Sequence, residues 1–161
     1  MLKSSALVLF LMLPFALSAQ QNVEISVSAN VGGAIEMFTI QTLDFEDIER
    51  NNSIISVDPI ESARAGKMIA RGAPNSEFRV DYLREREMSN TAGTSTLIFN
   101  YNIAGNSVNE QETAELLDQE MRDLQFNEDG EFFIWVGGNT DISEAEPGRY
   151  EGEFTLEIEY I

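Results

Sequence analysis

The stretch Phe154-Thr155-Leu156-Glu157-Ile158-Glu159-Tyr160 decides the fold class of this chain. Apolar and polar side chains alternate along it, which is typical of a β-strand with one buried face. The same period of two is found at Leu97–Ile103 and at Phe132–Val136. Antiparallel sheets with one face on a core and the other in solvent produce this pattern. We therefore expect a protein built from antiparallel strands.

Shorter apolar runs carry the pattern through the rest of the chain. They lie at Val23–Ala29, Ile35–Ile40, Leu43–Ile48, Ile55–Val57, Met68–Ala70 and Phe78–Tyr82. Turn signals separate the runs at Gly32-Gly33, Gly72-Ala73-Pro74, Gly105-Asn106, Asp129-Gly130, Gly137-Gly138 and Pro147-Gly148. Many short strands with regular turns predict an all-β fold, an antiparallel β-sandwich.

Three segments carry more specific predictions. The Asp129-Gly130 turn is expected to join Leu124 and Phe126 to Phe132 and Ile134 in a hairpin. The segment 109–124 is expected to form one short amphipathic helix that covers an end of the sandwich, because its apolar residues recur at steps of three and four. Those residues are Ala114, Leu117, Met121 and Leu124, with Asn109 and Glu112 as a capping box. The segment 84–96, with alternating charges followed by small polar residues, is expected to be an exposed loop.

Composition excludes several kinds of chemistry. The 161 residues contain neither histidine nor cysteine, which rules out thiol nucleophiles, Ser-His-Asp relays, zinc fingers and disulfides. There are 28 Asp and Glu against 10 Lys and Arg, which gives a net charge of -18 at pH 7. Nucleic acid is therefore not an expected partner, because its recognition needs a basic surface. Nothing places two carboxylates in one cleft, so we expect a protein that is not an enzyme.

The first nineteen residues have the pattern of an export signal. Lys3 precedes an apolar run from Ala6 to Leu17, and Leu17-Ser18-Ala19 ends in a small residue that a signal peptidase accepts. The run is short for a bilayer span, and no later run is long enough to be one. We expect residues 1–19 to be a signal peptide, 20–161 to be a single β-sandwich domain, and the mature protein to be exported without a transmembrane segment. Its location would be the periplasm, the cell surface or the exterior.

Two resemblances arise at the C-terminal strand. The segment Gly148–Ile161, together with Leu43-Asp44-Phe45 and Phe133–Gly138, resembles a family of exported bacterial proteins called domain of unknown function 4402. The same strand is similar to that of chaperone–usher pilins, with Tyr160 penultimate, Gly148 at the glycine position, and Phe154, Leu156 and Ile158 as alternating apolar residues. These resemblances imply a β-sandwich of immunoglobulin-like or pilin-like form.

The pilin resemblance also implies a mode of assembly. A pilin subunit lacks one strand, and a chaperone and then the N-terminal strand of the next subunit complete it by β-augmentation. The segment with Val23, Ile25, Val27 and Ala29 is the donor-strand candidate here, and the partners would be further copies or a periplasmic chaperone. The alternative is that this segment pairs within its own domain, because alternation does not distinguish the two.

A binding module is the second function that the sequence allows. Calcium is the ligand considered first, because Asp44-Phe45-Glu46-Asp47 and Asn127-Glu128-Asp129-Gly130-Glu131 gather oxygen donors, although neither has the spacing of an EF-hand. Glycan is the other, if Trp135, Tyr101 and Tyr150 face outward together. We therefore expect an exported structural or adhesive surface protein, pilin-like in assembly, with a secreted monomeric module for calcium or glycan as the alternative and no cofactor.

Overall fold

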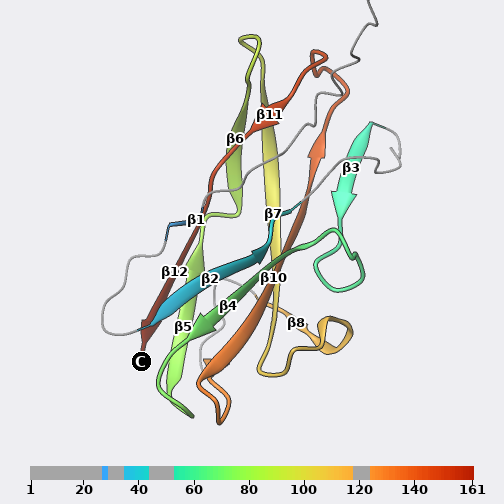
Figure 1. Cartoon of the computed structure of the whole chain (residues 1–161). Coiled ribbons are helices and arrows are strands. Elements are labelled where there is room, and N and C mark those ends of the chain that lie inside the picture. The colour runs from blue at the N-terminus through green and yellow to red at the C-terminus, as the bar shows by residue number, and fades with distance from the viewer. Residues whose placement is uncertain (1–26, 29–34, 44–52, 118–123) are drawn as a thin grey trace, which may run out of the picture.

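The computed structural model describes residues 27–28, 35–43, 53–117 and 124–161, which form two β-sheets packed on each other (Figure 1). The elements are β1 (Val27–Ser28), β2 (Glu36–Gln41), β3 (Ile54–Val57), β4 (Gly66–Arg71), β5 (Glu77–Tyr82), β6 (Glu85–Asn90), β7 (Thr96–Asn106), the 3₁₀ helix η1 (Gln111–Thr113), β8 (Glu115–Leu116), β9 (Leu124–Gln125), β10 (Glu131–Asp141), β11 (Tyr150–Glu151) and β12 (Phe154–Tyr160). One sheet has the order β1-β12-β5-β9. The other has the order β11-β6-β7-β10-β4-β2, with β3 beside β10 and β8 beside β7.

All of these strand pairings are antiparallel except that of β1 with β12. The predicted all-β antiparallel sandwich is thus confirmed. Runs of β-branched and aromatic residues at a period of two account for it, because such residues pack well on a pleated surface that is half buried.

The centre of the larger sheet is the pairing of its two longest strands, β7 and β10. Each has 11 residues, and the register runs from Phe133 opposite Asn106 to Thr140 opposite Phe99. The other edge of β10 pairs first with β4 and then with β3, while the chain between those two strands loops away from the sheet. Pairing on both edges removes the backbone of β10 from water.

The core lies between the two sheets and is rich in aromatic rings. Tyr101 of β7 and Phe154 of β12 have ring centroids 4.6 Å apart, so they join the sheets directly. Phe78 of β5 lies 4.2 Å from Phe126 and 5.1 Å from Phe132 of β10. Offset and edge-to-face contacts of this kind are favoured over stacked ones and add specificity to apolar burial.

Two chain segments bend from one sheet into the other at a shared corner. β5 and β6 are separated by Leu83-Arg84, and β11 and β12 by Gly152-Glu153, while β5 pairs with β12 and β6 with β11. A β-carbon on Gly152 would lie 2.8 Å from Met88 Cγ, so the corner is too tight for a larger residue there. The segments β5–β6 and β11–β12 therefore connect the two sheets at this corner.

The predicted helix over 109–124 is wrong in the described part of that segment. Gln111–Thr113 make only a turn of 3₁₀ helix, β8 follows it and pairs with β7, and Leu124 belongs to β9. The Leu117 N–H donates to the Ile103 carbonyl at 2.9 Å. Beyond the part of β7 that pairs with β6, its edge therefore pairs with β8. Strand pairing with a distant segment outweighs the weak helical preference of such a short apolar pattern.

Three other local predictions also fail. The segment 84–96 contains β6, in which Met88 and Asn90 are buried while Glu85 and Glu87 are exposed. Gly137-Gly138 lies inside β10 rather than in a turn. The Asp129-Gly130 turn exists, with Gly130 at φ 75°, but β9 before it pairs with β5 and not with β10, so it forms no hairpin.

The inner glycines of β10 generate the first prediction. A β-carbon at Gly138, whose φ is 147°, would lie 2.1 Å from the Asn100 carbonyl oxygen of β7. We expect Gly138→Ala to lower the free energy of unfolding by more than about 2 kcal/mol, because it strains the backbone and separates the central strands. Urea unfolding followed by fluorescence of the buried Trp135 measures this change.

Gly93→Ala is the matched control. Its β-carbon would meet only side-chain atoms, the nearest being Glu146 Oε2 at 3.1 Å. We expect the free energy of unfolding of this variant to stay within about 0.5 kcal/mol of the wild-type value. Equal losses in the two variants would contradict the role given to Gly138.

Candidate functional site: the edge of the C-terminal strand

β12 buries one row of side chains and exposes the other. Phe154, Leu156 and Ile158 are buried in the core, whereas Glu157 and Glu159 are exposed. The residues singled out in the sequence therefore form one continuous inner row. This row belongs to a strand at the border of the smaller sheet, next to β1.

The backbone of β12 directs alternate groups to that border. Ile161 donates its N–H to the Glu77 carbonyl of the segment beside it, at 3.2 Å. In an antiparallel ladder, hydrogen-bonded pairs alternate with pairs that have no hydrogen bond between them. Ile161 and Glu77 form a hydrogen-bonded pair, so every second pair before it along β12 and β5 is hydrogen-bonded as well. Leu156, Ile158 and Tyr160 lie in the intervening pairs, which have no hydrogen bond between the two strands. Their N–H and C=O groups point away from β5, toward the outer edge.

Only β1 among the described residues pairs with this outer edge. Val27 lies opposite Phe154, and Ser28 opposite Thr155, in a parallel register within the same chain. Leu156, Ile158 and Tyr160 have no strand partner on that side within the described part of the chain. Of the expected donor residues, Val23, Ile25 and Ala29 lie outside the described residues.

The segment from Gly148 to Tyr160 is held at both ends by contacts with other parts of the molecule. The Tyr160 hydroxyl accepts a hydrogen bond from the Ala73 N–H at 2.7 Å, and its ring lies 6.2 Å from that of Phe126. Gly148, at φ 156°, lies against the buried Asn90, whose Oδ1 would be 2.8 Å from a β-carbon at this position. Arg79 and Glu159 form an ion pair across β5 and β12. The strand is therefore held in place, and among the described residues only β1 pairs with its outer edge.

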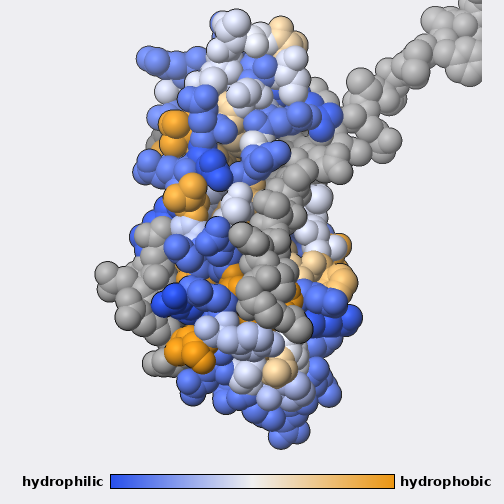
Figure 2. All heavy atoms as spheres, turned by 90° about the vertical axis from the view of Figure 1, so that its left-hand side faces the viewer, coloured by the Kyte–Doolittle hydropathy of each residue, from blue (hydrophilic) through white to orange (hydrophobic). Residues whose placement is uncertain are grey.

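The surface around this edge is hydrophilic. Figure 2 looks onto the side of the molecule that carries β12 and shows separate hydrophobic spots surrounded by hydrophilic residues. Glu153, Glu157 and Glu159 are exposed on or beside β12. Repulsion between such carboxylates keeps two copies of β12 from pairing with each other, a common protection of edge strands.

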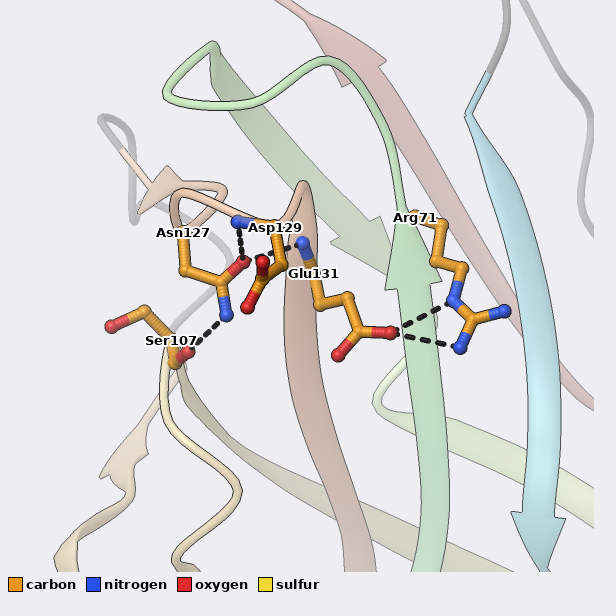
Figure 3. A network of polar contacts seen from close by, with 5 residues as sticks. All are labelled: Arg71, Ser107, Asn127, Asp129 and Glu131. Atoms are coloured by element: carbon orange, nitrogen blue, oxygen red, sulfur yellow. Dashed lines mark hydrogen bonds and ion pairs between the residues drawn. The ribbon is translucent and has the colours of Figure 1, made fainter.

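The second calcium candidate, Asn127–Glu131, is a turn in which the side-chain oxygen of Asn127 and one carboxylate oxygen of Glu131 already have partners (Figure 3). Asn127 Oδ1 accepts hydrogen bonds from the N–H groups of Asp129 at 3.0 Å and Glu131 at 2.8 Å, and its Nδ2 donates to the Ser107 carbonyl at 2.9 Å. Glu131 Oε1 lies 2.9 Å from Arg71 Nε. The first candidate, with Asp44, lies outside the described residues, and the described residues contain no group of three acidic side chains suited to a metal ion.

The aromatic residues considered for glycan binding do not form an exposed surface. Trp135 is 2% and Tyr101 3% exposed, so the expectation that Trp135 faces outward with Tyr101 is wrong. The Lys67 ammonium lies 5.5 Å from the Trp135 ring centroid and donates to Asn109 of the segment before η1. Alternation places Trp135 on the face of β10 opposite to that of Ile134, but both faces of this strand are buried.

Sequence reasoning missed two features that bear on function. One is Asn127, which organises the turn before β10, and the signal for it was an Asn followed by Asp-Gly. The other is that the expected run Ile35–Ile40 forms β2 at an edge of the larger sheet, where Phe38 and Ile40 are 39% and 57% exposed. Its signal was the lack of charged residues over Met37–Gln41, in which Met37, Phe38 and Ile40 are apolar.

Comparison with known proteins gives no relative from which a function could be transferred. No protein-family model matches the chain, and no curated protein matches it significantly. Within the described ranges, no helix has the length and apolar character needed to cross a bilayer.

The turn at Asn127 gives a prediction about stability. Asn127→Ala removes two accepted hydrogen bonds and one donated one, so we expect the free energy of unfolding to fall by about 2 kcal/mol. Asn102→Ala, at an exposed position of β7, is the control and should change it by less than about 0.5 kcal/mol. Urea unfolding is measured with and without calcium. A calcium-induced rise in the midpoint that Asn127→Ala abolishes would show that this turn binds the ion.

The buried tyrosines give a prediction about alkaline pH. Burial raises the pKa of Tyr101 to about 12, against a smaller opposing effect of Arg86, and burial also raises the pKa of Tyr82. Above its ordinary value of 10.0, Tyr101 ionises in the unfolded chain before it ionises in the folded one. The stability that the neutral Tyr101 hydroxyl contributes is therefore fully present below pH 10.0, and it is lost as the pH rises toward 12.

Tyr101→Phe should remove part of that loss. We expect the slope of unfolding free energy against pH to be smaller in this variant, by up to about 1.4 kcal/mol per pH unit. Urea unfolding at a series of alkaline pH values measures it. A variant with the same slope as the wild type would show that the Tyr101 hydroxyl is not protected from solvent.

Proposed function

We propose that this protein is an exported structural or adhesive subunit of a bacterial surface that assembles by β-strand donation. The observation that carries the proposal is the outer edge of β12, where the backbone groups of Leu156, Ile158 and Tyr160 are directed outward and β1 covers only Phe154 and Thr155. An edge of this kind is the acceptor in β-augmentation, since main-chain hydrogen bonds supply affinity.

The donor in this proposal is the segment with Val23, Ile25, Val27 and Ala29 of a neighbouring copy. It contains a single carboxylate, Glu24, so it meets less repulsion from Glu157 and Glu159 than another copy of β12 would. The pairing of Val27 with Phe154 within one chain would then be made between chains. Such an exchange of an identical element leads to open chains of subunits, because the contact is head-to-tail.

Two features of the sequence support this proposal. The signal-like residues 1–19 put the chain on an export route, and the C-terminal strand resembles that of the pilins and of the family called domain of unknown function 4402. The absence of cysteine does not oppose the proposal, because a domain of this size buries enough surface to be stable without disulfides.

Paired cysteines test the proposal, because the chain has none of its own. Ser28→Cys and Thr155→Cys occupy paired positions of β1 and β12. When the two single variants, each beginning at Gln20, are mixed and oxidised, we expect a disulfide between chains. Val108→Cys, at an exposed position away from this edge, replaces Thr155→Cys in the control mixture and should give no such product.

The double variant separates the two modes of pairing. If Ser28→Cys and Thr155→Cys in one chain form only an internal disulfide, and the mixed single variants form none, the N-terminal strand belongs to its own sandwich and donation is excluded. Light scattering after size-exclusion chromatography gives the second measurement. Open-ended assemblies of more than two chains, formed by the chain from Gln20, should disappear in a Val23→Asp, Ile25→Asp variant.

A further inference from the structure

The larger sheet ends in a second open edge, the strand β2. Within the described residues β2 pairs only with β4, so its other side has no strand partner. The register with β4 skips Ile40, which is 57% exposed, and Phe38 two residues before it is 39% exposed. Natural edge strands are usually protected by charge, proline or extreme shortness. The stretch Met37–Gln41 has neither a charge nor a proline.

An apolar row crosses the sheet and reaches this edge. Phe133 of β10 lies opposite Ile69 of β4, and Ile69 lies opposite Phe38 of β2. Phe133 is 5% exposed and Ile69 is partly buried, so exposure increases along the row toward β2. Arg71 stacks on Phe38 at 5.1 Å from the ring centroid, but its charge is paired with Glu131 at 2.8 Å. Among the described residues, no strand continues this row beyond β2.

The net charge of the chain indicates which partner suits the edge of β2. At a net charge of -18, two copies repel each other over most of their surfaces. The five residues Met37–Gln41 form an uncharged stretch at an open edge, whereas β12 exposes Glu157 and Glu159. A second copy can approach this neutral edge with less repulsion than it would meet at β12.

We propose that β2 pairs with β2 of a second copy in an antiparallel, twofold-symmetric contact centred on Thr39. This register puts Phe38 opposite Ile40 of the other copy, and Ile40 opposite its Phe38. Glu36 then faces Thr42, so no like charges are opposed. The apolar rows of two copies join into one row, and the larger sheets become continuous. Aromatic residues opposite β-branched ones are among the favourable cross-strand pairs.

This contact is independent of strand donation at β12, because it uses the other sheet and none of the N-terminal residues. Donation is head-to-tail and extends without limit, whereas the β2 contact is isologous and closes at two copies. A protein that has both would join pairs of subunits within a longer assembly.

Charge substitutions at the edge test the contact in the chain beginning at Gln20. In the background Val23→Asp, Ile25→Asp, which removes the donor pattern, we expect a dimer by light scattering. Adding Ile40→Glu should lower its association constant at least about tenfold, because two apolar pairs are lost and two carboxylates are brought together. Ile54→Glu, at an exposed apolar residue of β3, is the matched control and should leave the dimer unchanged. Circular dichroism checks that each variant is folded.

A single cysteine tests the register. Thr39→Cys places the two thiols opposite each other at the twofold axis, so oxidation should give a disulfide-linked dimer in higher yield than Ile54→Cys. Equal yields from the two variants, or a donor-background protein that is monomeric at every concentration, would overturn the proposal. So would a dimer that persists unchanged in Ile40→Glu.

Discussion

The antiparallel pairing of β7 with β10 is the contact on which the rest of the structure depends. It runs over most of the length of both strands, and the opposite edge of β10 is filled in turn by β4 and β3. With both edges paired and both faces covered, β10 lies at the centre of the larger sheet. Gly137 and Gly138 make the close approach possible, because a β-carbon at Gly137 would lie 2.3 Å from the Val57 carbonyl oxygen. The smaller sheet then packs on the inner residues of this pair through contacts such as Tyr101 with Phe154.

Within the described residues, the strand edges that lack a partner lie away from this closed centre. Two of them, β12 and β2, differ in charge. The exposed side chains of β12 include Glu157 and Glu159, so this edge suits a partner strand with little negative charge. The edge of β2 is uncharged over Met37–Gln41 and suits a copy of itself. In the contacts proposed above, repulsion between acidic surfaces would leave association of the copies to these two strand edges.

The sequence located most of the strands correctly, because a period of two is a local property of each run. β4, β5, β7, β10 and β12 all lie where the alternation predicts them. It failed where a local pattern fits two structures. Ala114 and Leu117 have a helical spacing, yet the unpaired edge of β7 draws the segment into β8. The charged run at Arg84–Glu87 resembled a loop, although charged side chains are tolerated on the solvent face of a strand such as β6.

The candidate site shows the same division. Sequence alone determined that Phe154, Leu156 and Ile158 form one inner row, that the surface is acidic, and that thiol and imidazole chemistry are absent, because all of these follow from residue type and spacing. Only the tertiary structure decided that Trp135 is buried and that, among the described residues, the outer edge of β12 pairs only with β1 and β2 is the last strand of the larger sheet. The physical reason is that strand order and edge exposure depend on pairing between residues far apart in the chain. An alternating pattern shows which residues share a face of a strand, but it does not show which strand lies beside it.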